Sequence, residues 1–124
     1  MSLELKGVGI DLVSLSRIRK FLNRHPSKIS RRLLTKSERK KISSKRLSPV
    51  VLARLLAAKE AFFKAVGRSW MGLEGFGAIE IKGFAHGRFQ VESKFPDGRF
   101  RKAEGAFFGT QKFVGAQVTL WSED

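Results

Sequence analysis

One long helix constrains the fold of this chain more than any other feature. Apolar residues recur at helical spacing from Pro49 to about Val66, which predicts a continuous helix. Ser48 is a favourable N-cap, Pro49 suits the first helical position, and Gly67 suits the residue that follows the last turn. The apolar positions that recur are Leu52, Leu55, Leu56, Phe63 and Val66. The rest of the chain must therefore supply elements that pack against this helix.

The first half of the chain is otherwise a strand followed by short helices. Residues 5–13 predict a buried strand, in which Val8, Ile10 and Leu12 alternate with glycines and Asp11. Ser14 or Ser16 can cap the next helix, whose apolar stripe is Leu15, Ile18, Phe21 and Leu22. A short helix is expected to carry Ile29, Leu33 and Leu34. Thr35 and Glu38 form a capping box that opens another helix, through about Ile42.

The second half changes to the period of strands. Residues 78–84, 88–95, 100–108 and 113–121 are each predicted to be strands, and Gly72, Gly75 and Gly77 lie in a loop before them. The length of 124 residues suits one domain, residues 1–124. The predicted fold class is α+β, with helices packed on an antiparallel sheet.

Charge indicates an anionic partner. The net charge is +14, and 16 of the 25 basic residues lie in residues 1–62. Nucleic acid, a membrane surface, an acidic protein and a polyphosphate cofactor all suit such a field. There is no cysteine, so a metal would need oxygen or imidazole ligands, and His25 and His86 are the two histidines. No apolar run is long enough to span a membrane and residues 1–6 lack the order of a secretory signal, so we expect a cytoplasmic protein without a membrane partner.

Four charged residues are candidates for chemistry. Asp11 lies in an apolar strand, where a carboxylate needs a cation or several N–H donors; its alternative role is to cap the next helix. Glu60 and Lys64 share one face of the long helix, where they are either a surface ion pair or the lining of a cleft. Two carboxylates from separate elements suit Mg²⁺, and Lys59 and Lys64 would then hold phosphate oxygens.

Three motifs resemble the holo-acyl-carrier-protein synthases, a 4'-phosphopantetheinyl transferase family. These are residues 9–13 with Arg17 and Ile18, then Leu34, Thr35 and Glu38, and finally the helix of residues 52–67. The resemblance covers about the first 67 residues and implies a homotrimer with active sites between subunits.

The resemblance also implies the reaction and its residues. Asp11 and Glu60 would bind Mg²⁺ with the pyrophosphate of coenzyme A, and Lys64, with Lys59 as a second candidate, would contact phosphate. A serine of an acidic acyl carrier protein, in fatty acid biosynthesis, would attack the β-phosphate, and its proton would pass to a metal-bound water or a site carboxylate. The carrier would dock on the helix that carries Arg17, Lys20 and Arg24. The alternative for these three residues is a solvated helix face.

The sequence departs from the family at several positions. Ser14 stands where the family usually has glutamate, and the family's serine–histidine pair falls near Phe108 and Gly109. Two other functions therefore stay open. One is a carrier-protein-binding homologue that has lost catalysis. The other, less favoured, is a small basic nucleic-acid-binding module that would use rings such as Trp70 and Trp121.

Overall fold

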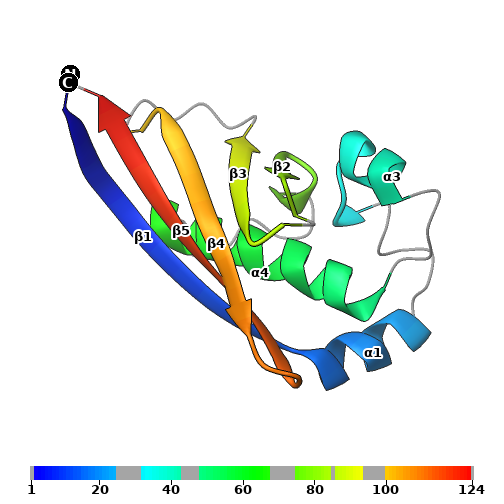
Figure 1. Ribbon diagram of the computed structural model, residues 1–124. Helices are drawn as coiled ribbons and strands as arrows, with labels where there is room; N and C mark the ends of the chain where they lie inside the picture. Colours follow the sequence, from blue (N-terminus) through cyan, green and yellow to red (C-terminus); the bar gives the residue numbers. More distant parts are fainter. Residues whose placement is uncertain are drawn as a thin grey trace.

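Five strands form one antiparallel sheet, and the longest helix crosses one of its faces. The computed structural model describes residues 2–24, 32–42, 48–67, 75–84, 86–93 and 100–123. In chain order the elements are β1 (Leu3–Ser14), α1 (Leu15–Arg24), α3 (Lys36–Ile42), α4 (Pro49–Val66), β2 (Ile79–Lys82), β3 (Arg88–Ser93), β4 (Lys102–Gly109) and β5 (Phe113–Glu123). The strand order is β1-β5-β4-β3-β2 (Figure 1). The predicted α+β fold is confirmed.

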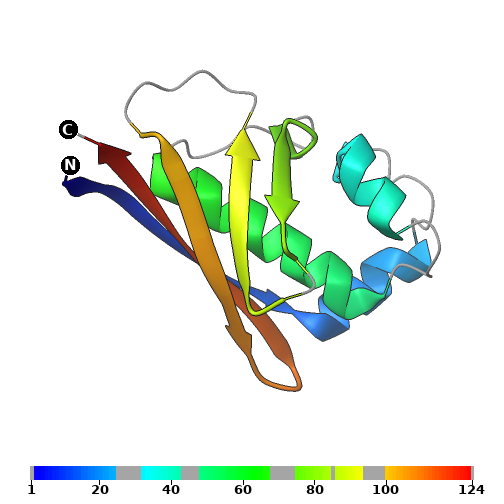
Figure 2. The ribbon, with the colours of Figure 1, turned by 45° about the horizontal axis from the view of Figure 1, so that its top comes forward.

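Helix α4 is the centre of the hydrophobic core. The Ser48 side chain accepts a hydrogen bond from the N–H of Val51 at 3.1 Å, and Gly67 ends the helix in the left-handed region with φ 84°. Both predicted ends are therefore confirmed. Figure 2 shows α4 crossing behind the strands of the sheet. The helix buries its apolar residues against the inward row of the strands, which includes Ile79, Ile81, Phe89, Val91, Ala103, Val114, Ala116, Val118 and Leu120.

Strand β1 packs on α4 through its glycines, which corrects the prediction that its apolar residues are buried. A Cβ atom on Gly9 would lie 1.9 Å from the carbonyl oxygen of Ala61 and 2.6 Å from the amide nitrogen of Ala65. Only a residue without a side chain permits this approach between strand and helix. Five large side chains of β1 therefore point to the opposite face of the sheet, where each is more than half exposed: Leu3, Leu5, Val8, Ile10 and Leu12.

A β-bulge keeps those five side chains on the same face. Leu5 pairs with Trp121 and Gly7 pairs with Leu120, so Lys6 is the extra residue between two consecutive pairs. Side chains alternate between the two faces along a strand, and the extra residue shifts this alternation by one position. Val8, Ile10 and Leu12 therefore point to the same face as Leu3 and Leu5.

The shorter elements follow the sequence closely. Helix α1 buries Leu15 and Ile18 as expected, whereas Phe21 is exposed. Leu33 and Leu34 are buried, as expected, but they lie in a turn and not in a helix. The region around Ile29 lies outside the described residues, as do His25, Trp70 and Gly72. The four predicted strands appear as β2 to β5. Within the described residues, no helix is long and apolar enough to cross a membrane.

Candidate active site

Strand β1 and helix α4 bring Asp11 and Lys64 together. The ammonium nitrogen of Lys64 lies 2.8 Å from Oδ1 of Asp11 and 3.3 Å from the carbonyl oxygen of Ile10. The side chain of Asp11 is 17% exposed and that of Lys64 is 55% exposed. The close approach of β1 to α4 at Gly9, two residues before Asp11, produces this contact. A strand carboxylate that faces the helix thus has a cation beside it, as its apolar neighbours require.

Glu60 shares the electrostatic environment of Asp11 and Lys64. Partial burial raises the pKa of the Glu60 carboxyl above its ordinary value, and the negative charge of Asp11 raises it further. The positive charge of Lys64 acts in the opposite direction on the same pKa. Two carboxylates and one ammonium group leave a net negative charge when all are ionised, so this site can attract a further cation.

This donor set suits a hard divalent cation. The described residues contain no group of three or more His, Cys, Asp or Glu side chains that could hold a metal ion. A site on Asp11 and Glu60 would therefore supply two carboxylates. Mg²⁺ characteristically takes one or two protein carboxylates and completes its shell with water and substrate phosphates. The metal role of both residues and the phosphate role of Lys64 remain predictions, and the residues fit them.

Lys59 does not belong to this site, which corrects its assignment as a phosphate ligand. Its side chain is 0% exposed. The ammonium group donates to the Leu33 carbonyl at 2.6 Å, to Oε1 of Glu38 at 2.7 Å and to the Phe76 carbonyl at 2.9 Å. An ammonium group has three N–H donors, so none remains for a cofactor. Burial lowers the pKa of Lys59, and the charge and hydrogen bond of Glu38 oppose that shift.

Glu38 has a larger role than the capping box predicts. It accepts from the N–H of Thr35 at 2.9 Å, and its own N–H donates to the Thr35 hydroxyl at 3.1 Å, which confirms the box. Its Oε1 also binds Lys59, and its Oε2 accepts the N–H of Ile81 at 2.7 Å. One carboxylate therefore joins α3, α4 and the edge strand β2. Local sequence signals the cap, but the two distant partners are visible only once the chain has folded.

Helix α1 presents the predicted basic surface. Arg17, Lys20 and Arg24 are all exposed, and their spacing of three and four residues places them along one face. Leu15 and Ile18 hold the opposite side of α1 in the core. The docking role of the three basic residues remains a prediction.

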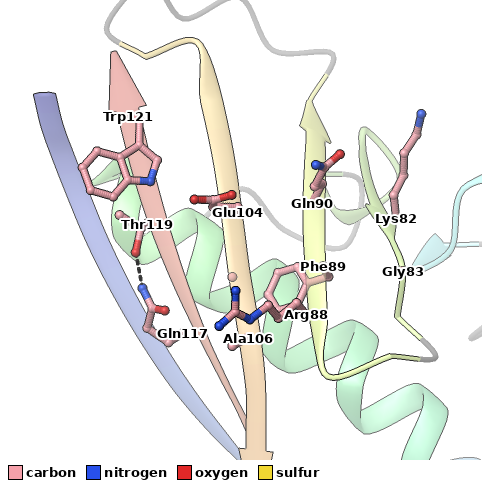
Figure 3. A pocket seen from close by; sticks show the side chains of 11 residues that line it. Lys82, Gly83, Arg88, Phe89, Gln90, Glu104, Ala106, Gln117, Thr119 and Trp121 are labelled. Carbon is pink, nitrogen blue, oxygen red and sulfur yellow. Dashed lines mark hydrogen bonds between the residues drawn. The ribbon is translucent and has the colours of Figure 1, made fainter. Parts of the chain in front are cut away.

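The open face of the sheet carries a hollow away from Asp11. Its volume is about 620 Å³, and its lining includes Lys82, Arg88, Glu104 and Trp121 (Figure 3). In the described part of the chain, the indole Nε1 of Trp121 is the only buried side-chain nitrogen or oxygen without a hydrogen-bond partner. A second hollow, of about 460 Å³, lies between α1, α4 and the β4–β5 turn. Neither is lined by Asp11, Glu60 or Lys64.

Comparison with known proteins agrees with the resemblance of the motifs. Residues 7–118 match the model of the 4'-phosphopantetheinyl transferase superfamily. The holo-[acyl-carrier-protein] synthase of Azoarcus sp. is 43% identical over 63 residues, which are 51% of this chain and 50% of that protein. The synthase of Anoxybacillus flavithermus is 38% identical over 96 residues, covering 75% and 78% of the two chains. The first curated relatives are thus matched over about half of their length.

A solved structure extends the likeness to nearly the whole chain. A holo-(acyl-carrier-protein) synthase from Bacillus anthracis, in complex with CoA (3',5'-ADP), superposes with a TM-score of 0.77 at 28% identity. The superposition covers 98% of this chain and 100% of that one.

Proposed function

Because this chain belongs to the 4'-phosphopantetheinyl transferase superfamily, we propose that it is a holo-[acyl-carrier-protein] synthase. It transfers the 4'-phosphopantetheine group of coenzyme A to a serine of an acidic acyl carrier protein. The observation that carries this proposal is the grouping of Asp11, Glu60 and Lys64 where β1 meets α4. Family membership comes from the whole chain, whereas these three residues supply the chemistry.

Asp11 and Glu60 hold the divalent cation in this proposal, and Lys64 holds phosphate. A bound Mg²⁺ would supply charge neutralisation on the pyrophosphate of coenzyme A. Asp11 comes from β1 and Glu60 from α4, and the charge of Asp11 acts on Glu60, which supports a cation shared by the two carboxylates. The exposed side chain of Lys64 ends 2.8 Å from the Asp11 carboxylate, which supports a contact with phosphate bound beside Asp11. Positioning and charge neutralisation account for most of the catalysis in phosphoryl transfer.

The reaction exchanges the phosphoanhydride bond of coenzyme A for a phosphate ester bond to serine. The serine oxygen of the carrier forms a bond to the β-phosphorus of coenzyme A, and its proton passes to a site carboxylate or to a water molecule. The bond from that phosphorus to the bridging oxygen breaks, and adenosine 3',5'-bisphosphate leaves. The B. anthracis synthase in complex with CoA (3',5'-ADP) supports coenzyme A as the co-substrate here.

The carrier protein docks on the exposed face of α1. Arg17, Lys20 and Arg24 supply three positive charges to an acidic partner. Since α1 follows directly from β1, a partner on α1 is brought close to Asp11. Such a surface contributes chiefly to the rate of association and to specificity. The substrate in this proposal belongs to fatty acid biosynthesis in the cytoplasm.

The working assembly is a homotrimer in this proposal. The outward row of β1 supports it, because five large apolar side chains are exposed side by side on the face of the sheet opposite α4. Contiguous apolar patches of this kind mark interaction surfaces. Light scattering on the native chain should give three times the monomer mass. Val8→Lys, which places a charge in the row, should give a smaller species, and a native monomer would contradict the assembly.

Mass spectrometry of the carrier tests the transferase directly. Apo carrier protein incubated with this chain, coenzyme A and Mg²⁺ should gain one phosphopantetheine group. Asp11→Ala and Glu60→Ala should each abolish the gain, whereas Lys82→Met, at the far edge of the sheet, should retain it. Binding to the carrier without any gain in mass would identify a binding homologue that has lost catalysis. Salt-sensitive binding to generic nucleic acid without carrier binding would support the basic nucleic-acid-binding module.

A further inference from the structure

Lys64 already occupies the place of a cation at Asp11. Its ammonium group lies 2.8 Å from the carboxylate, and no other hydrogen bond to that carboxylate is found within the described residues. Its second contact is the Ile10 carbonyl, at 3.3 Å. The side chain is 55% exposed, so most of its four-carbon stem can move without disturbing the core.

Lys59, in the same helix, is held in one position by its contacts and differs from Lys64 in this respect. Its side chain is fully buried and makes three short hydrogen bonds, two of them to backbone carbonyls. Lys64 makes a single contact to a carboxylate and keeps a donor free for solvent or another anion. An exposed ion pair of this kind is worth only ~1 kcal/mol or less, so a competing ligand can break it. Lys64 is therefore suited to change partners.

We propose that Lys64 is an exchangeable counter-ion that couples the binding of the divalent cation to the binding of coenzyme A. Before ligands bind, Lys64 neutralises Asp11. When both ligands are present, Lys64 contacts a phosphate oxygen of coenzyme A and leaves both carboxylates to the metal ion. This inference rests on the proposed function, and it concerns the order and strength of binding rather than the identity of the reaction.

The coupling follows from elementary electrostatics. A divalent cation that binds alone meets the positive charge of Lys64 a few ångströms away and has to displace it from Asp11. Coenzyme A offers Lys64 an alternative anion, so the repulsion is relieved once the phosphates are in place. By thermodynamic linkage, coenzyme A and the metal ion then strengthen each other's binding by the same factor.

Binding of Mn²⁺ alone tests the first half of the inference. The free Mn²⁺ signal in electron paramagnetic resonance gives the dissociation constant without any turnover. Lys64→Met should bind Mn²⁺ about 5- to 10-fold more tightly than the native chain, from Coulomb repulsion at a partly screened site. Lys82→Met is the matched control, because it removes another exposed lysine in an ion pair, 2.7 Å from Glu92, and should not change the affinity. Equal or weaker Mn²⁺ binding by Lys64→Met would overturn the inference.

Coenzyme A, added without carrier protein, tests the second half. Saturating coenzyme A should tighten Mn²⁺ binding by a larger factor in the native chain than in Lys64→Met. Equal factors would also overturn the inference. Asp11→Asn separates this failure from a failure of the proposed function. If Asp11→Asn weakens Mn²⁺ binding but Lys64→Met changes nothing, the metal site stands and only the exchange is wrong; if Asp11→Asn has no effect, both are wrong.

Discussion

Replacing Lys59 with methionine should destabilise the protein severely although it touches no substrate. Methionine fills a similar volume but leaves the Leu33 and Phe76 carbonyls without their donor. It also leaves the carboxylate of Glu38, which is 1% exposed, without its counter-charge. Removing one partner of a buried ion pair costs about 3–5 kcal/mol of unfolding free energy. For a chain of this size each kcal/mol lowers the melting temperature by about 3–5 °C, so we expect a fall of about 10–25 °C.

A double-mutant cycle shows whether the loss of stability comes from breaking the Lys59–Glu38 ion pair or from a poorer fit of the new side chain. Glu38→Gln removes the counter-charge of Lys59 and keeps an oxygen acceptor for only one of two amides, because the Thr35 N–H donates to Oε1 and the Ile81 N–H donates to Oε2. It should therefore also cost about 3–5 kcal/mol. The double variant should cost clearly less than the sum of the two single variants, because each single variant strands a buried polar partner.

A surface ion pair of the same length provides the control for that cycle. The Lys82–Glu92 pair is 2.7 Å long, as is Lys59–Glu38, but both of its side chains are exposed. Lys82→Met should therefore cost less than about 1 kcal/mol. Urea unfolding followed by circular dichroism measures all of these variants. A cost below about 1 kcal/mol for Lys59→Met, or strict additivity in the cycle, would refute the reasoning.

Three further predictions concern the site and its supports. Gly9→Ala should lower the free energy of unfolding by about 2–3 kcal/mol and reduce phosphopantetheine transfer, because its Cβ would meet the Ala61 carbonyl. Gly87→Ala is the control, because its Cβ would meet nothing within 4 Å. Denaturation and transfer assays should show no change for Gly87→Ala. The raised pKa of Glu60 means that its contribution to stability is present below the ordinary value of 4.5 and is lost as the pH rises through the raised value. Metal-free Glu60→Gln should therefore melt at a higher temperature than the native chain at pH 7, and the difference should disappear below about pH 4.5; the opposite trend would mean that Glu60 is stabilised as an anion. Arg17→Glu should raise the KM for carrier protein several-fold without changing coenzyme A affinity by calorimetry, and an unchanged KM would place docking elsewhere.

The sequence predicts those parts of the fold that depend on local signals. The long helix begins and ends where predicted because Ser48 and Gly67 act through their own backbone neighbours. The capping box at Thr35 is local in the same way. The burial of β1 was predicted wrongly, because alternation shows that a strand has two faces without showing which one a helix covers. The glycines decide this, and their role depends on the backbone of Ala61.

The candidate site was predictable only in part for a related reason. Asp11, Glu60 and Lys64 lie in two motifs with a specific spacing, and the structure brings them together. Lys59 stands next to Glu60 in the same motif and was assigned to the same site. Its three partners come from other segments of the chain, so the residues next to Lys59 in the sequence do not indicate that it points into the core.

The bulge at Lys6 makes β1 unequally sensitive to changes in length. Leu5 and Gly7 pair with consecutive residues of β5, so deleting Lys6 would leave an uninterrupted strand in which every side chain keeps its face. Deleting a paired residue beyond Asp11, such as Leu12, while Val13 and Ser14 keep their partners would instead turn over the residues between the bulge and the deletion. Val8 and Ile10 would then face α4, and Gly9 and Asp11 would face away from it. Loss of one residue is therefore tolerable close to the bulge, whereas loss of one residue beyond Asp11 would separate Asp11 from the helix that it faces.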